Sequence, residues 1–369
     1  MDSLTINERD RDGSRIVSPC PEHPFSRLKI GARTVGGNYF RSLRTTRQKK
    51  HAKKNEQRSL FHKRYYMRFI KYNHYFYMFT LKNMKRFLSL ALIALIVPAI
   101  SARAGKIITD SVQSSILGSE VKFNVYLPSG FDKTDKQYPV VYLLHGLSDN
   151  YETWAKKGSV QLVADELISS GEADEMVIIM PNAGDPDTHN VWNGYFNMPG
   201  WNYEDFFFKE FIPTVEKKYR IIGDKGHRAV MGLSMGGGGS TVYCQRHPDM
   251  FSSCYAMSAW LDNEAGQVGG NNTQKDKLYL VCQAVRDHSA LDFIDNADEA
   301  TLEALRTVKW FFDCGDDDFL VQLSFDLHMK MKAKNVKDEL RIRNGVHNWE
   351  YWHLALRMAL PFASRNFDR

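Results

Sequence analysis

Ser234 lies at the centre of a G-x-S-x-G motif that runs from Gly232 to Gly236. A serine in this motif can act as a nucleophile when a strand turns sharply into a helix and leaves its Oγ exposed. Side chains two residues to either side would collide with the strand and the helix, so both positions favour glycine. An apolar segment precedes the motif and a helical one follows it, which favours a nucleophile over a glycine-rich turn with an incidental serine.

A serine hydroxyl needs a base to take its proton and a carboxylate to orient that base. His347 is the candidate base, because it follows the last expected strand and precedes the last expected helix. His328 and His353 fall inside helical patterns and are less well placed. The alternative for His347 is an ordinary histidine of a surface loop.

The carboxylate is expected after the strand that ends near Cys314, where four aspartates compete. Asp313 still belongs to the apolar strand segment, whereas Asp316 and Asp317 are typical of turns and helix N-caps. Asp318 is the preferred candidate, and the family resemblance described below supports that choice.

Attack on a carbonyl creates a negative oxygen, which two backbone N–H groups can stabilise. One is expected from Met235, directly after the serine. The other is expected from Leu147, in the loop that follows the first buried strand. The alternative is that His145 and Gly146, just before Leu147, form an ordinary turn at the end of a strand.

These residues require a framework of alternating strands and helices, which indicates an α/β fold with a mostly parallel central sheet and helices on both faces. Residues 105–369 are expected to form this single domain. The expected strands cover residues 121–127, 140–144, 176–180, 228–231, 254–257, 309–312 and 340–342. The expected helices cover residues 160–169, 203–218, 319–334 and 349–367, with one more from the serine motif to Arg246. Residues 262–277 have loop composition, either a flap near the site or a surface excursion.

Residues 84–104 have the layout of a secretory signal peptide. Lys85 and Arg86 precede an apolar run at residues 87–100, and Ala102 and Ala104 provide the small residues of a cleavage site. The run is short for a bilayer, which needs about 20 residues, although a signal anchor remains the alternative. We therefore expect a secreted or periplasmic protein without stable membrane insertion after cleavage.

Residues 1–83 differ from the rest of the chain in charge. They contain 19 Lys and Arg against 6 Asp and Glu, whereas residues 105–369 contain 27 against 37. The acidic domain argues against nucleic acid as a main partner. We expect translation to start naturally at Met84, with residues 1–83 a non-native or disordered extension; the alternative is a basic arm that binds nucleic acid or a membrane surface.

Four sequence blocks resemble those of the Putative esterase family, which contains esterase D (S-formylglutathione hydrolase), the feruloyl and acetylxylan esterases of carbohydrate esterase family one, and the mycolyltransferases. The blocks are LLHG at residues 143–146, GLSMGG at 232–237, CGDDDFL at 314–320 and GVHNWEYW at 345–352. The resemblance implies the α/β-hydrolase fold, with Ser234, Asp318 and His347 as catalytic residues. It also implies ester hydrolysis through an acyl-enzyme, without a metal or organic cofactor.

Aromatic side chains in loops after the strands could bind the substrate by stacking. Trp154, Trp192, Tyr195 and Trp201 are the candidates, with packing within a long loop as the alternative. The acidic segment at residues 185–189 is interpreted as a turn rather than a metal site.

The substrate stays open at this level. Export favours a polymeric or extracellular ester, such as acylated plant polysaccharide, over cytosolic S-formylglutathione. The leading hypothesis is hydrolysis of an acetyl, feruloyl or short acyl ester, with a small molecule or a polysaccharide as the substrate. The alternatives are an acyltransferase with the same catalytic residues, an S-formylglutathione-type thioesterase and a catalytically silent binding module. The sequence determines neither the oligomeric state nor the pairing of the four cysteines after residue 105, which are Cys244, Cys254, Cys282 and Cys314.

Overall fold

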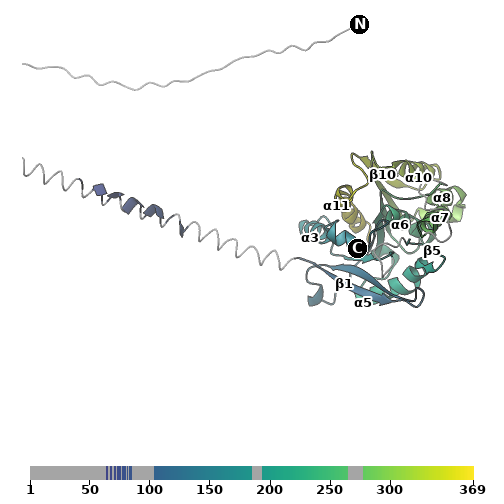
Figure 1. Cartoon of the computed structure of the whole chain (residues 1–369), viewed down its shortest axis with the longest axis horizontal. Coiled ribbons are helices and arrows are strands. Elements are labelled where there is room, and N and C mark those ends of the chain that lie inside the picture. Colours follow the sequence, from purple (N-terminus) through teal and green to yellow (C-terminus); the bar gives the residue numbers. More distant parts are fainter. Residues whose placement is uncertain are drawn as a thin grey trace, which may run out of the picture. The chain divides into compact units, whose positions relative to one another are not determined.

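The computed structural model describes residues 104–184, 193–264 and 277–369, together with scattered helical residues between 64 and 84 (Figure 1). The chain divides into one unit up to Leu88 and another from Ser89 onwards. The expected signal peptide at residues 84–104 falls almost wholly outside the described residues. No helix in the described part of the chain is long and apolar enough to cross a membrane.

An eight-stranded sheet forms the centre of the second unit, in the order β1-β2-β4-β3-β7-β8-β9-β10. β1 pairs with β2 and β2 with β4 in antiparallel fashion, and the other neighbours are parallel. This arrangement confirms the expected mostly parallel sheet. The strands are β1 (Lys106–Gln113), β2 (Glu120–Leu127), β3 (Val140–Leu144), β4 (Val177–Pro181), β7 (Arg228–Leu233), β8 (Ser253–Met257), β9 (Lys309–Gly315) and β10 (Asp338–Arg343), with a separate hairpin of β5 (Asn197–Met198) and β6 (Trp201–Asn202).

Helices cover both faces of the sheet and bury two apolar clusters. Successive residues of a strand point to opposite faces, so Tyr142 of β3 joins one cluster and Leu143 the other. Figure 1 shows α3 and α11 on one side and α6, α7 and α8 on the other. The helices are α2 (Thr153–Lys156), α3 (Val160–Ser170), α4 (Tyr203–Phe206), α5 (Ile212–Lys218), α6 (Met235–Arg246), α7 (Lys277–Asp287), α8 (Ala290–Asn296), α9 (Glu299–Leu305), α10 (Val321–Ala333) and α11 (Trp349–Arg365).

The helical segment at residues 203–218 differs from the expected single α-helix. A π-helical segment, Phe207–Phe211, separates α4 from α5. Pro213 stands near the start of α5, where its missing N–H costs little because the first turn leaves such groups unpaired. The apolar periodicity therefore identified the buried face correctly but not the change of helical pitch.

The parallel strands place the candidate residues at one edge of the sheet. Leu147 follows β3, Ser234 follows β7, Asp318 follows β9 and His347 follows β10. The carboxyl ends of parallel strands meet at a common edge, which is where ligand sites of α/β proteins form. Four segments that are distant in the sequence therefore converge on one site.

Candidate active site

The backbone of Ser234 makes the sharp turn that its motif predicts. Ser234 has φ 54° and ψ −117°, an unfavourable conformation for a residue with a side chain, and helix α6 begins at the next residue. A Cβ on Gly232 would lie 2.5 Å from the backbone of Gly236. A Cβ on Gly236 would lie 2.6 Å from the carbonyl oxygen of His145. Strand, turn and helix thus approach each other so closely that both positions require glycine.

Backbone hydrogen bonds to neighbouring segments hold Ser234 in this strained conformation. The Ser234 N–H donates to the carbonyl oxygen of Met257 at 2.9 Å. The Ser234 carbonyl oxygen accepts hydrogen bonds from the N–H groups of Gly238 and Trp260, each at 3.0 Å. The conformation of Ser234 is therefore fixed by β8 and α6 together rather than by its own preference.

Ser234, His347 and Asp318 form one chain of hydrogen bonds. His347 Nε2 lies 3.0 Å from Ser234 Oγ, and His347 Nδ1 lies 3.0 and 2.9 Å from the two carboxylate oxygens of Asp318. A carboxylate only accepts hydrogen bonds, so the ring proton belongs on Nδ1. Nε2 is then left to accept the proton of the serine hydroxyl. This is the arrangement that a general base needs to activate a nucleophile.

Asp318 is buried, and its carboxylate accepts several hydrogen bonds. Burial opposes its charge, but the hydrogen bonds from His347, from the Leu320 N–H at 2.9 Å and from Ser258 outweigh burial and lower the pKa of the carboxyl group. Ser258 also accepts a hydrogen bond from the indole N–H of Trp352 at 3.0 Å. Asp318 is therefore held as a carboxylate in a fixed orientation.

The three competing aspartates occupy other places. Asp313 lies in β9 at 0% exposure and accepts hydrogen bonds from the hydroxyl groups of Tyr255 and Tyr351. Asp316 accepts a hydrogen bond from the backbone N–H of Gly345 at 2.9 Å, and Asp317 is exposed. Within the described structure, only Asp318 of the four contacts His347.

The loop that carries Leu147 packs directly against the serine. A Cβ on Gly146 would lie 3.6 Å from the Cβ of Ser234, so the chain passes the nucleophile at van der Waals distance. Met235 is the first residue of α6, where the N–H has no partner within the helix. The N–H groups of Leu147 and Met235 thus belong to two segments that meet at Ser234.

His145 fixes the shape of this loop. Its Nδ1 lies 2.8 Å from the carbonyl oxygen of Gly146, and its Nε2 accepts a hydrogen bond from the Ala183 N–H at 3.0 Å. Burial of the ring lowers the pKa of His145 to about 4. The imidazole is therefore neutral near pH 7, with its proton on Nδ1, and joins the loop after β3 to the segment after β4.

Three of the four proposed substrate-binding aromatics are core residues, which corrects the expectation that they face a ligand. Trp154 and Tyr195 are each 1% exposed. The Trp154 indole N–H donates to the carbonyl oxygen of Leu144, and Tyr195 Oη donates to that of His145. Trp201 is 9% exposed and donates to the carbonyl oxygen of Gly194. These rings pack beneath the site because aromatic side chains gain more from burial than from solvent exposure.

Trp192 and the acidic segment at residues 185–189 lie outside the described residues. Within the described ranges, no group of three or more His, Cys, Asp and Glu side chains is arranged to hold a metal ion. Ser258 and Trp352 are supporting residues that the sequence analysis missed. Neither has a motif of its own, although Trp352 lies in the conspicuous block after His347.

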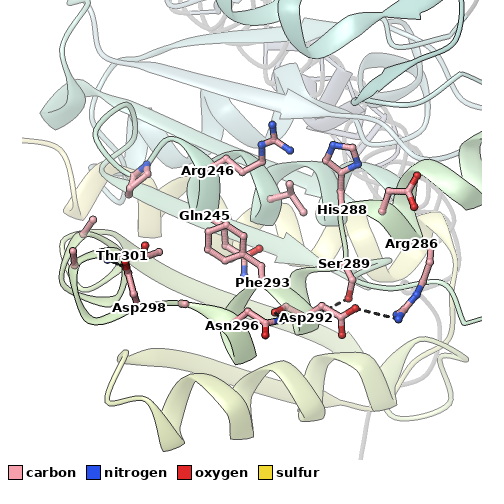
Figure 2. Close-up of a pocket in the computed structure, with 16 residues that line it drawn as sticks. Gln245, Arg246, Arg286, His288, Ser289, Asp292, Phe293, Asn296, Asp298 and Thr301 are labelled. Carbon is pink, nitrogen blue, oxygen red and sulfur yellow. Dashed lines mark hydrogen bonds and ion pairs between the residues drawn. The ribbon is translucent and has the colours of Figure 1, made fainter.

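A cavity of about 960 Å³ lies at the other end of α6 from Ser234 (Figure 2). Its lining includes Arg246 from the end of α6 and an ion pair between Arg286 and Asp292 at 3.1 Å. None of the three hydrogen-bonded residues Ser234, Asp318 and His347 lines this cavity. It is therefore separate from the candidate active site.

Comparisons with known proteins identify the family of this chain. The family model described as "Esterase: Putative esterase" matches residues 114–363. A solved ferulic acid esterase is 46% identical, with a TM-score of 0.69, over 72% of this chain and 100% of that chain. The solved ferulic acid esterase from Anaeromyces mucronatus, in complex with ferulic acid, shares the fold at 23% identity and a TM-score of 0.55, over 71% of this chain and 92% of that one.

A curated relative is the endo-1,4-beta-xylanase/feruloyl esterase of Xylanibacter ruminicola, which is 36% identical over 132 residues. This match covers 35% of the present chain and 18% of that protein, so the chain spans much less than two thirds of the relative. The family match extends over most of the described domain and includes all four motif blocks. The chain therefore belongs to the Putative esterase family and has the α/β-hydrolase fold.

Proposed function

We propose that this esterase hydrolyses feruloyl esters of carbohydrate and that Ser234, His347 and Asp318 are its catalytic residues. The observation that carries the proposal is the hydrogen-bond chain from Asp318 through His347 to Ser234 Oγ. The feruloyl group is supported by the 46% identity to a ferulic acid esterase that is matched over its whole length. Acetyl and short acyl groups are the next candidates, because the same chemistry acts on any carboxylic ester that the site admits.

The reaction would proceed in two acyl transfers. His347 Nε2 takes the proton of Ser234 Oγ, and the oxygen attacks the ester carbonyl carbon. The N–H groups of Leu147 and Met235 donate hydrogen bonds to the carbonyl oxygen as it becomes negative. The bond to the alcohol oxygen breaks, and this oxygen takes the proton from His347.

Water completes the cycle by the same route. His347 Nε2 removes a proton from the water molecule, whose oxygen attacks the acyl carbon bound to Ser234. The bond to Ser234 Oγ then breaks, and the serine regains its proton from His347. The products are a carboxylic acid and the free enzyme, so an alcohol that replaces water would instead give acyl transfer.

We also propose that the protein is exported, on the basis of the signal-peptide layout at residues 84–104. Export would bring the enzyme to acylated polysaccharide outside the cytoplasm. Amino-terminal sequencing of the protein isolated from its native source tests the proposed export. A chain that begins at Gly105 is expected, and one that retains residues 84–104 would contradict cleavage of the signal peptide.

A substrate panel tests the activity. The panel contains methyl ferulate, a feruloylated pentose, acetylated xylan and p-nitrophenyl acetate, and each is assayed with the parent and with Ser234→Ala. We expect hydrolysis of the feruloyl esters by the parent alone. Activity that is retained in Ser234→Ala would contradict the assignment of Ser234 as the nucleophile. Transfer of the acyl group to an added alcohol in preference to water would favour an acyltransferase.

A further inference from the structure

Phe319 is the most exposed large apolar side chain among the described residues, at 71% exposure. It follows Asp318 directly and precedes Leu320, which is buried. Removal of an aromatic ring from water is favourable, so a largely exposed one beside an active site is a candidate contact for a ligand.

The Phe319 ring lies next to the ring of His347. The ring centroids are 4.6 Å apart and the planes are inclined at 47°. On another side, the buried ring of Trp352 lies 4.8 Å from His347 and perpendicular to it. His347 is already oriented by Asp318 and packed by Trp352, so Phe319 is not needed to hold it.

The position next to His347 decides which part of the substrate Phe319 can meet. His347 Nε2 returns its proton to the leaving alcohol oxygen, which must come within about 3 Å of this nitrogen. In the proposed mechanism the acyl carbonyl oxygen would point toward the N–H groups of Leu147 and Met235. The alcohol, which leaves beside His347 Nε2, would then be the part of the substrate that lies nearer to the ring of Phe319.

We propose that Phe319 forms a subsite for the sugar ring of the alcohol, by stacking its exposed face on the apolar face of that sugar. Val346, which directly precedes His347, is a second exposed apolar side chain next to this histidine in the sequence, at 45% exposure. The inference rests on the proposed function, because only an ester of carbohydrate has a sugar as its leaving group. In this inference Phe319 contributes to the selectivity of the enzyme for the alcohol part of the ester and not to its selectivity for the acyl group.

The test compares two esters that share the acyl group and differ in the alcohol. Methyl ferulate has no sugar, and a feruloylated pentose has one, so the ratio of their kcat/KM values isolates the alcohol. In Phe319→Ala we expect the ratio of sugar ester to methyl ester to fall about five- to tenfold, the size of effect that loss of one aromatic stacking contact produces. Phe319→Trp keeps an aromatic face and is expected to retain the ratio.

Phe325→Ala is the matched control, because Phe325 is also an exposed phenylalanine, at 42%, and lies in α10. Its ratio should equal that of the parent. Equal losses of kcat/KM on both esters in Phe319→Ala would show that Phe319 positions His347. Unchanged kcat/KM values on both esters would show an idle surface residue, and either result overturns the inference. A parent protein that cleaves neither ester would instead refute the proposed function, and so the two failures are distinguishable.

Discussion

The hydroxyl group of Tyr195 donates a hydrogen bond to the backbone carbonyl oxygen of His145 at 2.9 Å. Both residues are 1% exposed. The carbonyl oxygen of Tyr195 in turn accepts a hydrogen bond from the hydroxyl of Tyr243, in the helix that follows the nucleophile. Helix α6 and the loop after β3, which carry the two candidate oxyanion donors, are thus joined through one buried tyrosine.

Replacing Tyr195 with phenylalanine should remove the hydrogen bond to His145 without leaving a cavity in the core. A buried carbonyl oxygen that loses its donor costs about 1–3 kcal/mol, so the melting temperature should fall by a few degrees. We also expect kcat to fall, because the Leu147 N–H would be less well positioned. Tyr138→Phe is the control, since Tyr138 is also 1% exposed but its hydroxyl makes no hydrogen bond with a described residue. A kcat of Tyr195→Phe equal to that of the parent would show that this hydrogen bond does not position the Leu147 N–H.

His145 should make stability depend on pH. Its pKa is about 4 in the folded protein and about 6.5 in an unfolded chain, because burial disfavours the charged ring. Between these pH values the unfolded chain binds more protons, so the contribution of His145 is complete above pH 6.5 and is lost as the pH falls toward 4. The difference in pKa corresponds to about 3 kcal/mol of unfolding free energy.

The measurement is chemical denaturation of the parent and of His145→Gln between pH 4 and pH 8. Other groups also titrate in this range, but they are common to both proteins. The difference in unfolding free energy between the two should therefore shrink as the pH falls below 6.5. A difference that stays constant with pH would show that the folded protein accommodates a charged His145.

The order of the reactive residues could be predicted from the sequence because each stands in a local motif with its own physical cause. The glycines around Ser234 are required by contacts of 2.5–2.6 Å within the turn. Continuous apolar segments such as Val140–Leu144 identified the central strands because parallel strands are buried on both faces. The structure brings Ser234, Asp318 and His347 together as expected, and their catalytic roles stay a prediction.

The supporting residues could not be predicted, because their roles depend on contacts between distant segments. Tyr195 and Trp154 follow strands, where a sequence cannot distinguish a ring that faces a ligand from one that packs beneath it. The strand β1 (Lys106–Gln113) was missed because it is an edge strand, only partly buried and paired only with β2. The periodicity of apolar residues indicates which residues are buried, so this signal is weakest in a strand with few buried residues.

Gly236→Ala should disrupt the turn around the nucleophile. The new Cβ would lie 2.6 Å from the carbonyl oxygen of His145 and 2.7 Å from that of Leu144, and backbone atoms cannot move aside as a flexible side chain can. We expect loss of activity by orders of magnitude and a lower melting temperature. Gly194→Ala is the matched control, because its Cβ would meet only Val281 at 3.7 Å, an ordinary contact. Equal behaviour of the two variants would contradict the close approach.

Asp318→Asn tests which aspartate orients the base. An asparagine would direct its carbonyl oxygen to the Leu320 N–H and its amide to His347 Nδ1. That nitrogen would then have to accept, so the ring proton would move to Nε2, which could no longer take the proton of Ser234. We expect kcat for p-nitrophenyl acetate to fall by about 10³- to 10⁴-fold with little change in KM. Asp317→Asn removes a charge from an exposed neighbour and should retain kcat; similar losses in both variants would refute the assignment to Asp318.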